Sequence, residues 1–212
     1  MKKVEMNLNG STLSIETGHV ARQSAGSVIV THGETSVLVA VNAAKEMRED
    51  IDFFPLQVEY RERHYAGGKI PGGFFKREAR PSEKEILTSR LTDRPIRPLF
   101  PKSFKYETQV IITAMSSDGK NMADVLAGIG ASAALTISDI PFNGPIATVR
   151  VGRVEGDFVV NPTREQMEES DMEIVVSGNE KTIVMVEGEA ELISEKEFID
   201  AMKFAHGPIK EL

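Results

Sequence analysis

The sequence contains no cysteine among its 212 residues, which excludes disulfides and thiolate metal sites. It also lacks an apolar run close to the roughly 20 residues that a bilayer-spanning helix needs. No apolar signal core follows Lys2 and Lys3, because the chain passes directly into an alternating pattern. With 41% hydrophobic and 27% charged residues, the chain can bury a core. We therefore expect a globular, cytoplasmic protein without membrane contact.

Several catalytic and metal-binding patterns are missing as well. The four histidines are scattered without metal-ligand spacing and are interpreted as structural. Residues 116–120 read Ser-Ser-Asp-Gly-Lys and resemble an anion-binding turn before a helix, but they lack the full phosphate-loop pattern of nucleotide triphosphatases. An acidic cluster at residues 165–173 is typical of a solvated helix end, although Mg²⁺ binding by its carboxylates is the open alternative. We assign no catalytic residue and no metal ligand.

Positive charge is concentrated in one segment. The whole chain carries a net charge of −7, yet residues 61–102 contain eleven Lys or Arg and five Asp or Glu. That segment therefore has a net charge of +6 and the remainder has −13. This asymmetry is typical of a phosphate-binding surface on an acidic body, or of a solvated helix with mixed charges.

The order of the expected elements indicates one α+β domain over residues 1–212. Alternating apolar residues predict a hairpin around Asn9-Gly10 and another joining residues 28–30 to 37–41. The second hairpin is almost continuously apolar, which predicts cover on both faces. Further strands are expected at 109–114, and two hairpins pair 149–154 with 158–160 and 172–176 with 182–186.

Four helices are expected in addition to these strands. Ser82 and Glu85 form a capping box for a helix that should end near Asp93, ahead of Pro95. Helical spacing predicts a second helix at 121–138, and its many small residues indicate a close approach to a neighbouring backbone. A short acidic helix should follow residue 163. The final helix, at about 194–210 and capped by Ser194, is expected to lead to a helical spacer beyond the sequence.

The most informative segment is the glycine-rich stretch at residues 67–77. Phe74 and Phe75 stand between Gly72-Gly73 and the cations Lys76 and Arg77. Aromatic rings that stack on bases, beside cations that contact phosphates, suit single-stranded RNA. The alternative is that the phenylalanines fix the loop to the core or fill an oligomer interface.

Three arginines follow at helical spacing. Arg90, Arg94 and Arg97 lie at i, i+4 and i+7 and could share one helix face. Guanidinium groups bind phosphates in a bidentate manner. The alternative is a network of salt bridges with Asp93.

These segments resemble the first RNase PH-type core domain of bacterial polynucleotide phosphorylases. The resemblance is carried by Tyr65–Glu78, Arg80–Glu83, Arg90–Pro101, Gly130–Leu135 and Ile140–Ile146, and it extends from the first strand to the last helix. It implies an RNase PH-like fold of the ribosomal protein S5 domain 2-like type. It also implies that Phe74, Phe75, Lys76 and Arg77 face the central pore of a ring, and that Arg80, Arg94 and Arg97 face a shared cleft.

The family resemblance further implies the reaction and the partners of the full-length enzyme. Inorganic phosphate attacks the 3′-terminal bond of RNA with the help of Mg²⁺ and releases nucleoside diphosphates, as part of mRNA turnover. The phosphate and metal sites belong to a second core domain of the same protein, and three subunits form the ring. We therefore expect this domain to bind single-stranded RNA and to bind no cofactor itself.

Two departures from the family pattern bear on function. Lys76 stands where arginine is common, and Gly119-Lys120-Asn121 stands where active domains carry a serine-rich phosphate turn. The first hypothesis is a non-catalytic, RNA-binding core domain of a phosphorolytic exoribonuclease, inactive when isolated. The alternatives are a free-standing RNA-binding ring subunit without enzymatic activity and a module used for assembly alone.

Overall fold

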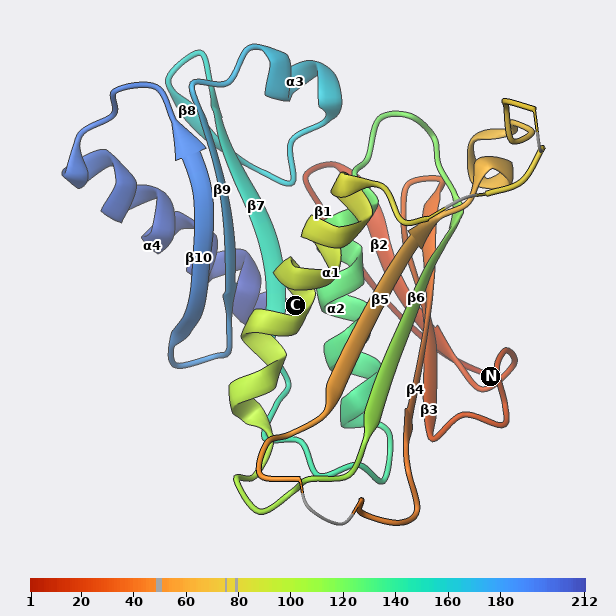
Figure 1. Cartoon of the computed structure of the whole chain (residues 1–212). Helices are drawn as coiled ribbons and strands as arrows, with labels where there is room; N and C mark the ends of the chain where they lie inside the picture. The colour runs from red at the N-terminus through yellow and green to blue at the C-terminus, as the bar shows by residue number, and fades with distance from the viewer. Residues whose placement is uncertain (49–50, 75, 79) are drawn as a thin grey trace.

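Six strands form the first sheet, in the order β1-β2-β3-β4-β6-β5 (Figure 1). Their bounds are β1 Lys2–Leu8, β2 Ser11–Thr17, β3 Gly26–His32, β4 Thr35–Ala43, β5 Leu56–Glu62 and β6 Thr108–Ser116. Strands β5 and β6 pair in parallel, and the other neighbours pair antiparallel. The computed structural model describes residues 1–48, 51–74, 76–78 and 80–212.

The predicted hairpins begin with a turn that its sequence dictates. Asn9 and Gly10 both have positive φ, 50° and 75°, as the tight turn between two twisted strands requires. This sets the register in which Leu8 lies opposite Ser11. The hairpin of β3 and β4, which turns at Gly33 and Glu34, is confirmed as well.

A second sheet of four strands has the order β10-β9-β7-β8. Its strands are β7 Ala147–Val154, β8 Asp157–Val160, β9 Met172–Gly178 and β10 Ile183–Ala190. The helices are α1 Glu83–Ile96, α2 Ala123–Thr136, α3 Arg164–Glu168 and α4 Glu195–Glu211, with short 3₁₀ helices η1 His64–Gly67 and η2 Arg97–Leu99. Each predicted helix and each predicted hairpin is therefore present.

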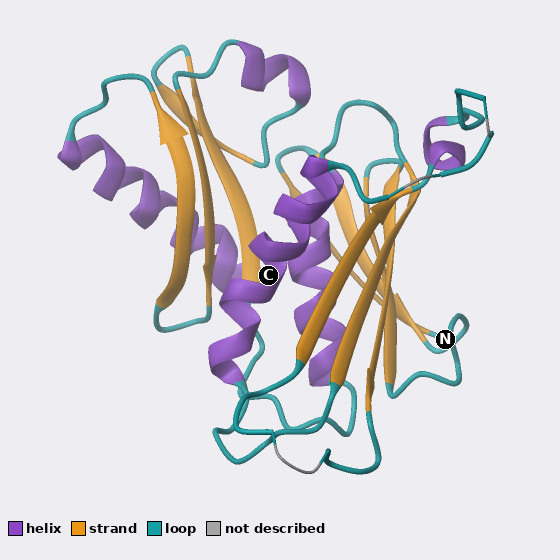
Figure 2. Ribbon diagram, viewed as in Figure 1, coloured by secondary structure: helices purple, strands orange, loops and turns teal. Residues whose placement is uncertain are grey.

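The elements stack as four layers. Helices α1 and α2 lie between the two sheets, and α4 covers the far face of the second sheet (Figure 2). Two clusters of buried apolar side chains fill the layers, one beneath the first sheet and one between β7, β9 and α4. Because successive side chains of a strand point to opposite faces, one face of each sheet is directed into these clusters.

The small residues of α2 allow it to lie close to both sheets. A Cβ on Gly128 would lie 2.5 Å from Thr148 Oγ1 of β7, and a Cβ on Gly130 would lie 2.5 Å from Val39 Cγ2 of β4. The backbone of β3 comes equally close, because a Cβ on Gly26 would lie 2.2 Å from the carbonyl oxygen of Ala134. The prediction of close approach is confirmed, since larger side chains would force these layers apart.

Two expectations need correction, and one strand was missed. Helix α1 continues through Pro95 to Ile96 instead of ending near Asp93; proline removes one ladder bond near the end, and burial of Pro95 and Ile96 compensates. Strand β5 was not predicted. Strands β3 and β4 are covered on one face, because Ile29 and Leu38 on the other face remain partly exposed.

Candidate nucleic-acid interface

The segment between β5 and α1 projects from the end of the first sheet (Figure 1). Phe74, near its tip, is 94% exposed, and Lys76 and Arg77 are exposed beside it. Gly73 has φ 75° and Lys76 has φ 48°, so the backbone turns sharply on both sides of the aromatic position. Phe75, the other predicted aromatic contact, lies outside the described residues. The tip therefore presents one described ring and two cations to solvent.

The first half of this loop is fixed to the body of the domain. The amide of Ser117 donates to the carbonyl of Ala66 in η1 at 2.9 Å. The Tyr65 hydroxyl lies 3.5 Å from Met115 Sδ, and the Lys69 amide donates to the His64 carbonyl at 2.9 Å. The glycine-rich tip thus extends from a compact turn that is anchored on the 116–121 loop.

The returning half of the loop is joined to its beginning by Glu78. One carboxylate oxygen accepts the backbone N–H of His64 at 2.9 Å, and the other accepts the guanidinium of Arg63. The His64 amide and the Arg63 side chain lower the pKa of Glu78, so the carboxylate is ionised at neutral pH.

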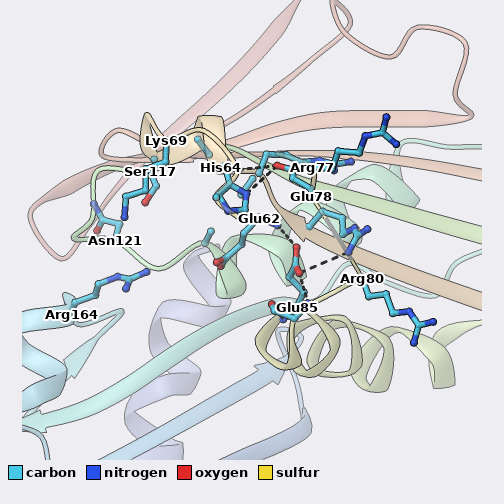
Figure 3. Close-up of a pocket in the computed structure, with 18 residues that line it drawn as sticks. Glu62, His64, Lys69, Arg77, Glu78, Arg80, Glu85, Ser117, Asn121 and Arg164 are labelled. Atoms are coloured by element: carbon cyan, nitrogen blue, oxygen red, sulfur yellow. Dashed lines mark hydrogen bonds and ion pairs between the residues drawn. The ribbon is translucent and has the colours of Figure 1, made fainter. Parts of the chain in front are cut away.

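Behind the loop lies a basic pocket of about 560 Å³ (Figure 3). Six arginine or lysine side chains and one histidine line it, against three glutamates. The cations are Arg61, Arg63, Lys69, Arg77, Arg80 and Arg164, and the acids are Glu62, Glu78 and Glu85. Arg61 lies 3.3 Å from Glu59 and 3.9 Å from Glu85. Among the described residues, Arg77, Arg80 and Arg164 have no ion-pair partner, so positive charge remains available to an anion.

The turn before α2 is closed by a side chain of the protein itself. One carboxylate oxygen of Asp118 accepts the amides of Lys120 and Asn121, both at 2.8 Å, and the hydroxyl of Thr35 at 2.9 Å. The other accepts the Asn121 side chain at 2.6 Å. Partial burial raises the pKa of Asp118, but these hydrogen bonds outweigh it and hold the pKa well below its ordinary range. The amides of an anion-binding turn are therefore already occupied by a carboxylate.

A second carboxylate lies in the first turn of α2. Asp124 accepts the amide of Val125 at 2.8 Å and two hydrogen bonds from Arg150 of β7, at 3.1 and 2.7 Å. The Nε of Arg150 lies 2.8 Å from a carboxylate oxygen of Glu173 on β9. The positive end of the α2 dipole thus faces internal negative charge, and an incoming phosphate would meet repulsion there.

Arg94 and Arg97 lie away from the basic pocket. Arg94 pairs with Glu187 of β10. Arg97 makes two 2.6 Å hydrogen bonds to Asp93 and donates to the carbonyl oxygens of Phe54 and Leu56. Both arginines line a separate cleft between α1 and β10. Within this chain both arginines therefore form salt bridges, as the alternative interpretation expected: Arg97 pairs with Asp93, and Arg94 pairs with Glu187.

Six of the seven predicted RNA-binding residues, all but Phe75, lie among the described residues. The structure brings Arg77 and Arg80 into one pocket, leaves Phe74 and Lys76 on the projecting tip, and sets Arg94 and Arg97 apart. Sequence reasoning missed the contributions of Arg63, Lys69 and Arg164. Arg63 and Lys69 lie in the basic segment and could have been included on charge alone. Arg164 comes from α3, more than eighty residues later in the chain, and no local pattern connects it to the loop.

Two carboxylates of the acidic cluster at residues 165–173 are likewise paired within the chain, Asp171 with Arg153 and Glu173 with Arg150. Arg153 binds Asp171 at 2.8 Å and Glu197 at 2.5 Å. Hydrogen bonds from Ser194 and from Arg153 lower the pKa of Glu197 to about 2. In the part of the chain that the structure describes, no group of three or more His, Asp or Glu side chains is arranged to hold a metal ion.

Comparison with known proteins identifies the family. The family model "3′ exoribonuclease family, domain 1" matches residues 11–141, and the model for domain 2 of the same family matches residues 144–207. The chain therefore belongs to the 3′ exoribonuclease family. The junction between the two matched segments lies after α2, where the chain passes from the first sheet to the second.

Close relatives narrow this assignment. The chain is 56% identical over 211 residues to the polyribonucleotide nucleotidyltransferase of Syntrophotalea carbinolica, covering 100% of this chain and 30% of that protein. It is also 56% identical to the protein of the same name from Geobacter sulfurreducens, covering 99% of this chain and 30% of that protein. The resemblance to polynucleotide phosphorylases is confirmed, and the chain spans about 30% of the length of these relatives.

Solved structures confirm the fold. A chain of the Archaeoglobus fulgidus exosome with RNA bound to the active site superposes with a TM-score of 0.71 at 19% identity, covering 92% of this chain and 85% of that one. A chain of an archaeal exosome core gives 0.69 at 21% identity, covering 91% and 82%. The predicted RNase PH-like fold is therefore confirmed. No helix among the described residues is long and apolar enough to cross a membrane.

Proposed function

We propose that this chain is an RNA-binding, non-catalytic core domain of a phosphorolytic 3′→5′ exoribonuclease, and that residues 1–212 form one such unit. The enzyme would cleave the 3′-terminal bond of RNA with inorganic phosphate and release nucleoside diphosphates in mRNA turnover. Its partners would be single-stranded RNA, a second core domain of the same protein that holds phosphate and Mg²⁺, and two further copies in a ring. Its place of action would be the cytoplasm.

The exposed aromatic-basic tip carries this proposal. A ring that is 94% exposed beside Lys76 and Arg77 offers a stacking surface and two charges in one short segment. Stacking on such a ring contributes about 1–3 kcal/mol per base, with little regard to sequence. The basic pocket behind the tip, with Arg77, Arg80 and Arg164, lies where the phosphates of a bound strand could follow.

The non-catalytic part of the proposal rests on the turn before α2. Phosphate binding at such a turn needs amides that are free to donate. Here Asp118 accepts the amides of Lys120 and Asn121, and Asp124 accepts that of Val125. The residues present do not fit a bound phosphate at this position, so no reaction step is assigned to it.

Fluorescence anisotropy with a labelled single-stranded oligoribonucleotide tests the RNA-binding role. Phe74→Ala should weaken binding by about 5-fold to 150-fold, the equivalent of losing one stacked base. Phe53→Ala is the matched control, because Phe53 is also exposed, at 62%, but lies outside the loop. Equal affinity of Phe74→Ala and the unmodified chain would contradict the proposal. In a salt titration, log K should fall linearly with log salt if phosphates contribute.

A phosphate-dependent assay tests the catalytic assignment. The isolated chain, incubated with poly(A), Mg²⁺ and inorganic phosphate, should release no ADP above background. Supplying the second core domain should restore release if the first hypothesis is right. ADP release by the isolated chain would refute the non-catalytic assignment, and RNA binding without release in the combined sample would favour the free-standing subunit.

A further inference from the structure

The loop that carries Phe74 is rich in glycine, which affects the entropy of RNA binding. It leaves β5 at Glu62 and returns to α1 at Glu83, and it contains four glycines, at positions 67, 68, 72 and 73, together with a Lys76 in the left-handed region. A glycine-rich segment has many accessible conformations, so ordering it on RNA costs conformational entropy. Any contact that closes the loop in advance reduces this cost and strengthens binding.

Glu78 provides such a contact where the two ends of the loop meet. Its carboxylate accepts the His64 amide at 2.9 Å and the Arg63 guanidinium, and the His64 Nδ1 lies 3.5 Å away. Arg63 and His64 begin the loop, and Glu78 lies only four residues before the helix cap at Ser82. The side chain is 26% exposed, so it is partly shielded from solvent.

The same carboxylate lines the basic pocket, whose cations otherwise favour an anion. Judged by charge alone, a carboxylate at this place repels RNA, and its removal should strengthen binding. Judged by its contacts, it joins Arg63 and His64 to the returning chain, and its removal should release the tip. The two roles predict changes of opposite sign.

We propose that Glu78 is a positioning residue of the RNA-binding loop, whose carboxylate closes the loop at its base and so holds Phe74 and Lys76 in place for RNA. This inference rests on the proposed RNA-binding function. Glu78 acts through the loop and makes no contact with RNA itself. Its contribution to binding therefore depends on the presence of the ring that it positions.

Glu78→Gln tests this directly, because glutamine keeps the size of the side chain and removes its charge. RNA affinity should fall about 3-fold to 10-fold, as expected for losing a charge-assisted contact that pre-orders a loop. Glu83→Gln, an exposed carboxylate in the first turn of α1, removes the same charge outside the loop. This control should bind RNA as well as or slightly better than the unmodified chain.

A double variant separates positioning from direct or general effects. In the Phe74→Ala background, Glu78→Gln should cause less than a 2-fold further loss, because the ring that it positions is absent. Hydrogen exchange should show faster exchange of the His64 amide in Glu78→Gln, with unchanged exchange in α2. Equal or tighter RNA binding by Glu78→Gln would overturn the inference, as would full additivity with Phe74→Ala.

Failure of the inference and failure of the proposed function give different results. If Phe74→Ala weakens RNA binding and Glu78→Gln does not, RNA binding by the loop stands and the positioning role falls. If Phe74→Ala has no effect on binding, the proposed function of the loop falls, and the positioning role falls with it.

Discussion

Replacing Asp124 with asparagine removes one charge from a pair that joins α2 to the second sheet. The Asp124 and Arg150 side chains are 11% and 5% exposed, and two hydrogen bonds of 3.1 and 2.7 Å connect them. Asparagine keeps the shape but leaves the buried guanidinium with Glu173 as its charge partner. Removing one member of a buried pair costs about 3–5 kcal/mol. Because Glu173 retains part of the compensation, we expect a loss near the lower limit, about 3 kcal/mol.

Urea unfolding followed by circular dichroism measures this loss. With an m-value of roughly 2 kcal/mol per molar urea, the midpoint should fall by about 1.5 M at constant m. The double variant Asp124→Leu with Arg150→Met should lose less than the sum of the two single losses, because it removes both charges together. A loss below about 1 kcal/mol for Asp124→Asn would refute the reasoning, since surface pairs already reach that value.

The same pair predicts a dependence on pH. Burial raises the pKa of Asp124, but the charge and hydrogen bonds of Arg150 outweigh it and leave the pKa lowered. A carboxyl group whose pKa is lower in the folded state stabilises the fold above its unfolded pKa, near 3.9. That stability should be lost as the pH falls below about 4 in the unmodified chain. Asp124→Asn should lack this part of the acid dependence.

Three further outcomes follow from the packing and from the turn before α2. Gly26→Ala places a Cβ 2.2 Å from the Ala134 carbonyl oxygen. Thermal unfolding should show that the free energy of unfolding falls by about 1–3 kcal/mol or more. A Cβ on Gly207 of α4 meets no atom within 4 Å outside its chain neighbours and its own helix backbone, and the gain in helix propensity is opposed by crowding against Pro208, so Gly207→Ala should change stability by less than about 1 kcal/mol; a loss as large as that of Gly26→Ala would contradict this reasoning. Asp118→Asn should flatten the decline in stability below about pH 4, because the pKa of Asp118 is lowered in the fold and its contribution is lost as the pH falls below the unfolded pKa, near 3.9. If urea unfolding shows the same loss of stability at acid pH in Asp118→Asn and in the unmodified chain, Asp118 makes no such contribution.

Local chemistry made much of the fold predictable. The Asn9-Gly10 turn needs positive φ at both residues, and the capping boxes of Ser82 and Ser194 form within four residues. The small residues of α2 also correctly predicted that this helix lies close to its neighbours, because only small side chains fit at a close contact. These features depend on contacts between near neighbours, which a sequence pattern can express.

Long-range pairings were not predictable in the same way. Strand β5 pairs in parallel with β6, about fifty residues later in the chain, and no turn links them. The position of β5 decides the contacts of Arg97, which donates to Phe54 and Leu56. Helical spacing predicted that Arg94 and Arg97 could share one helix face, but it could not show that Glu187 of β10 lies opposite Arg94. The seven predicted RNA-binding residues remain a prediction until binding is measured.

The hydrogen bonds that anchor the loop also determine how a mechanical force on the loop is transmitted through the domain. The amide of Ser117 bonds to Ala66 at the loop base, and the amide of Arg164 bonds to the carbonyl of Lys120 at 3.1 Å. These two backbone bonds run from the loop, across the 116–121 segment, to α3 beside the second sheet. Under the proposed function, tension on an RNA strand bound at Phe74 would therefore be transmitted to both sheets. The glycine-rich tip would deform under this force, while the hydrogen-bonded base of the loop and the 116–121 segment would keep their positions.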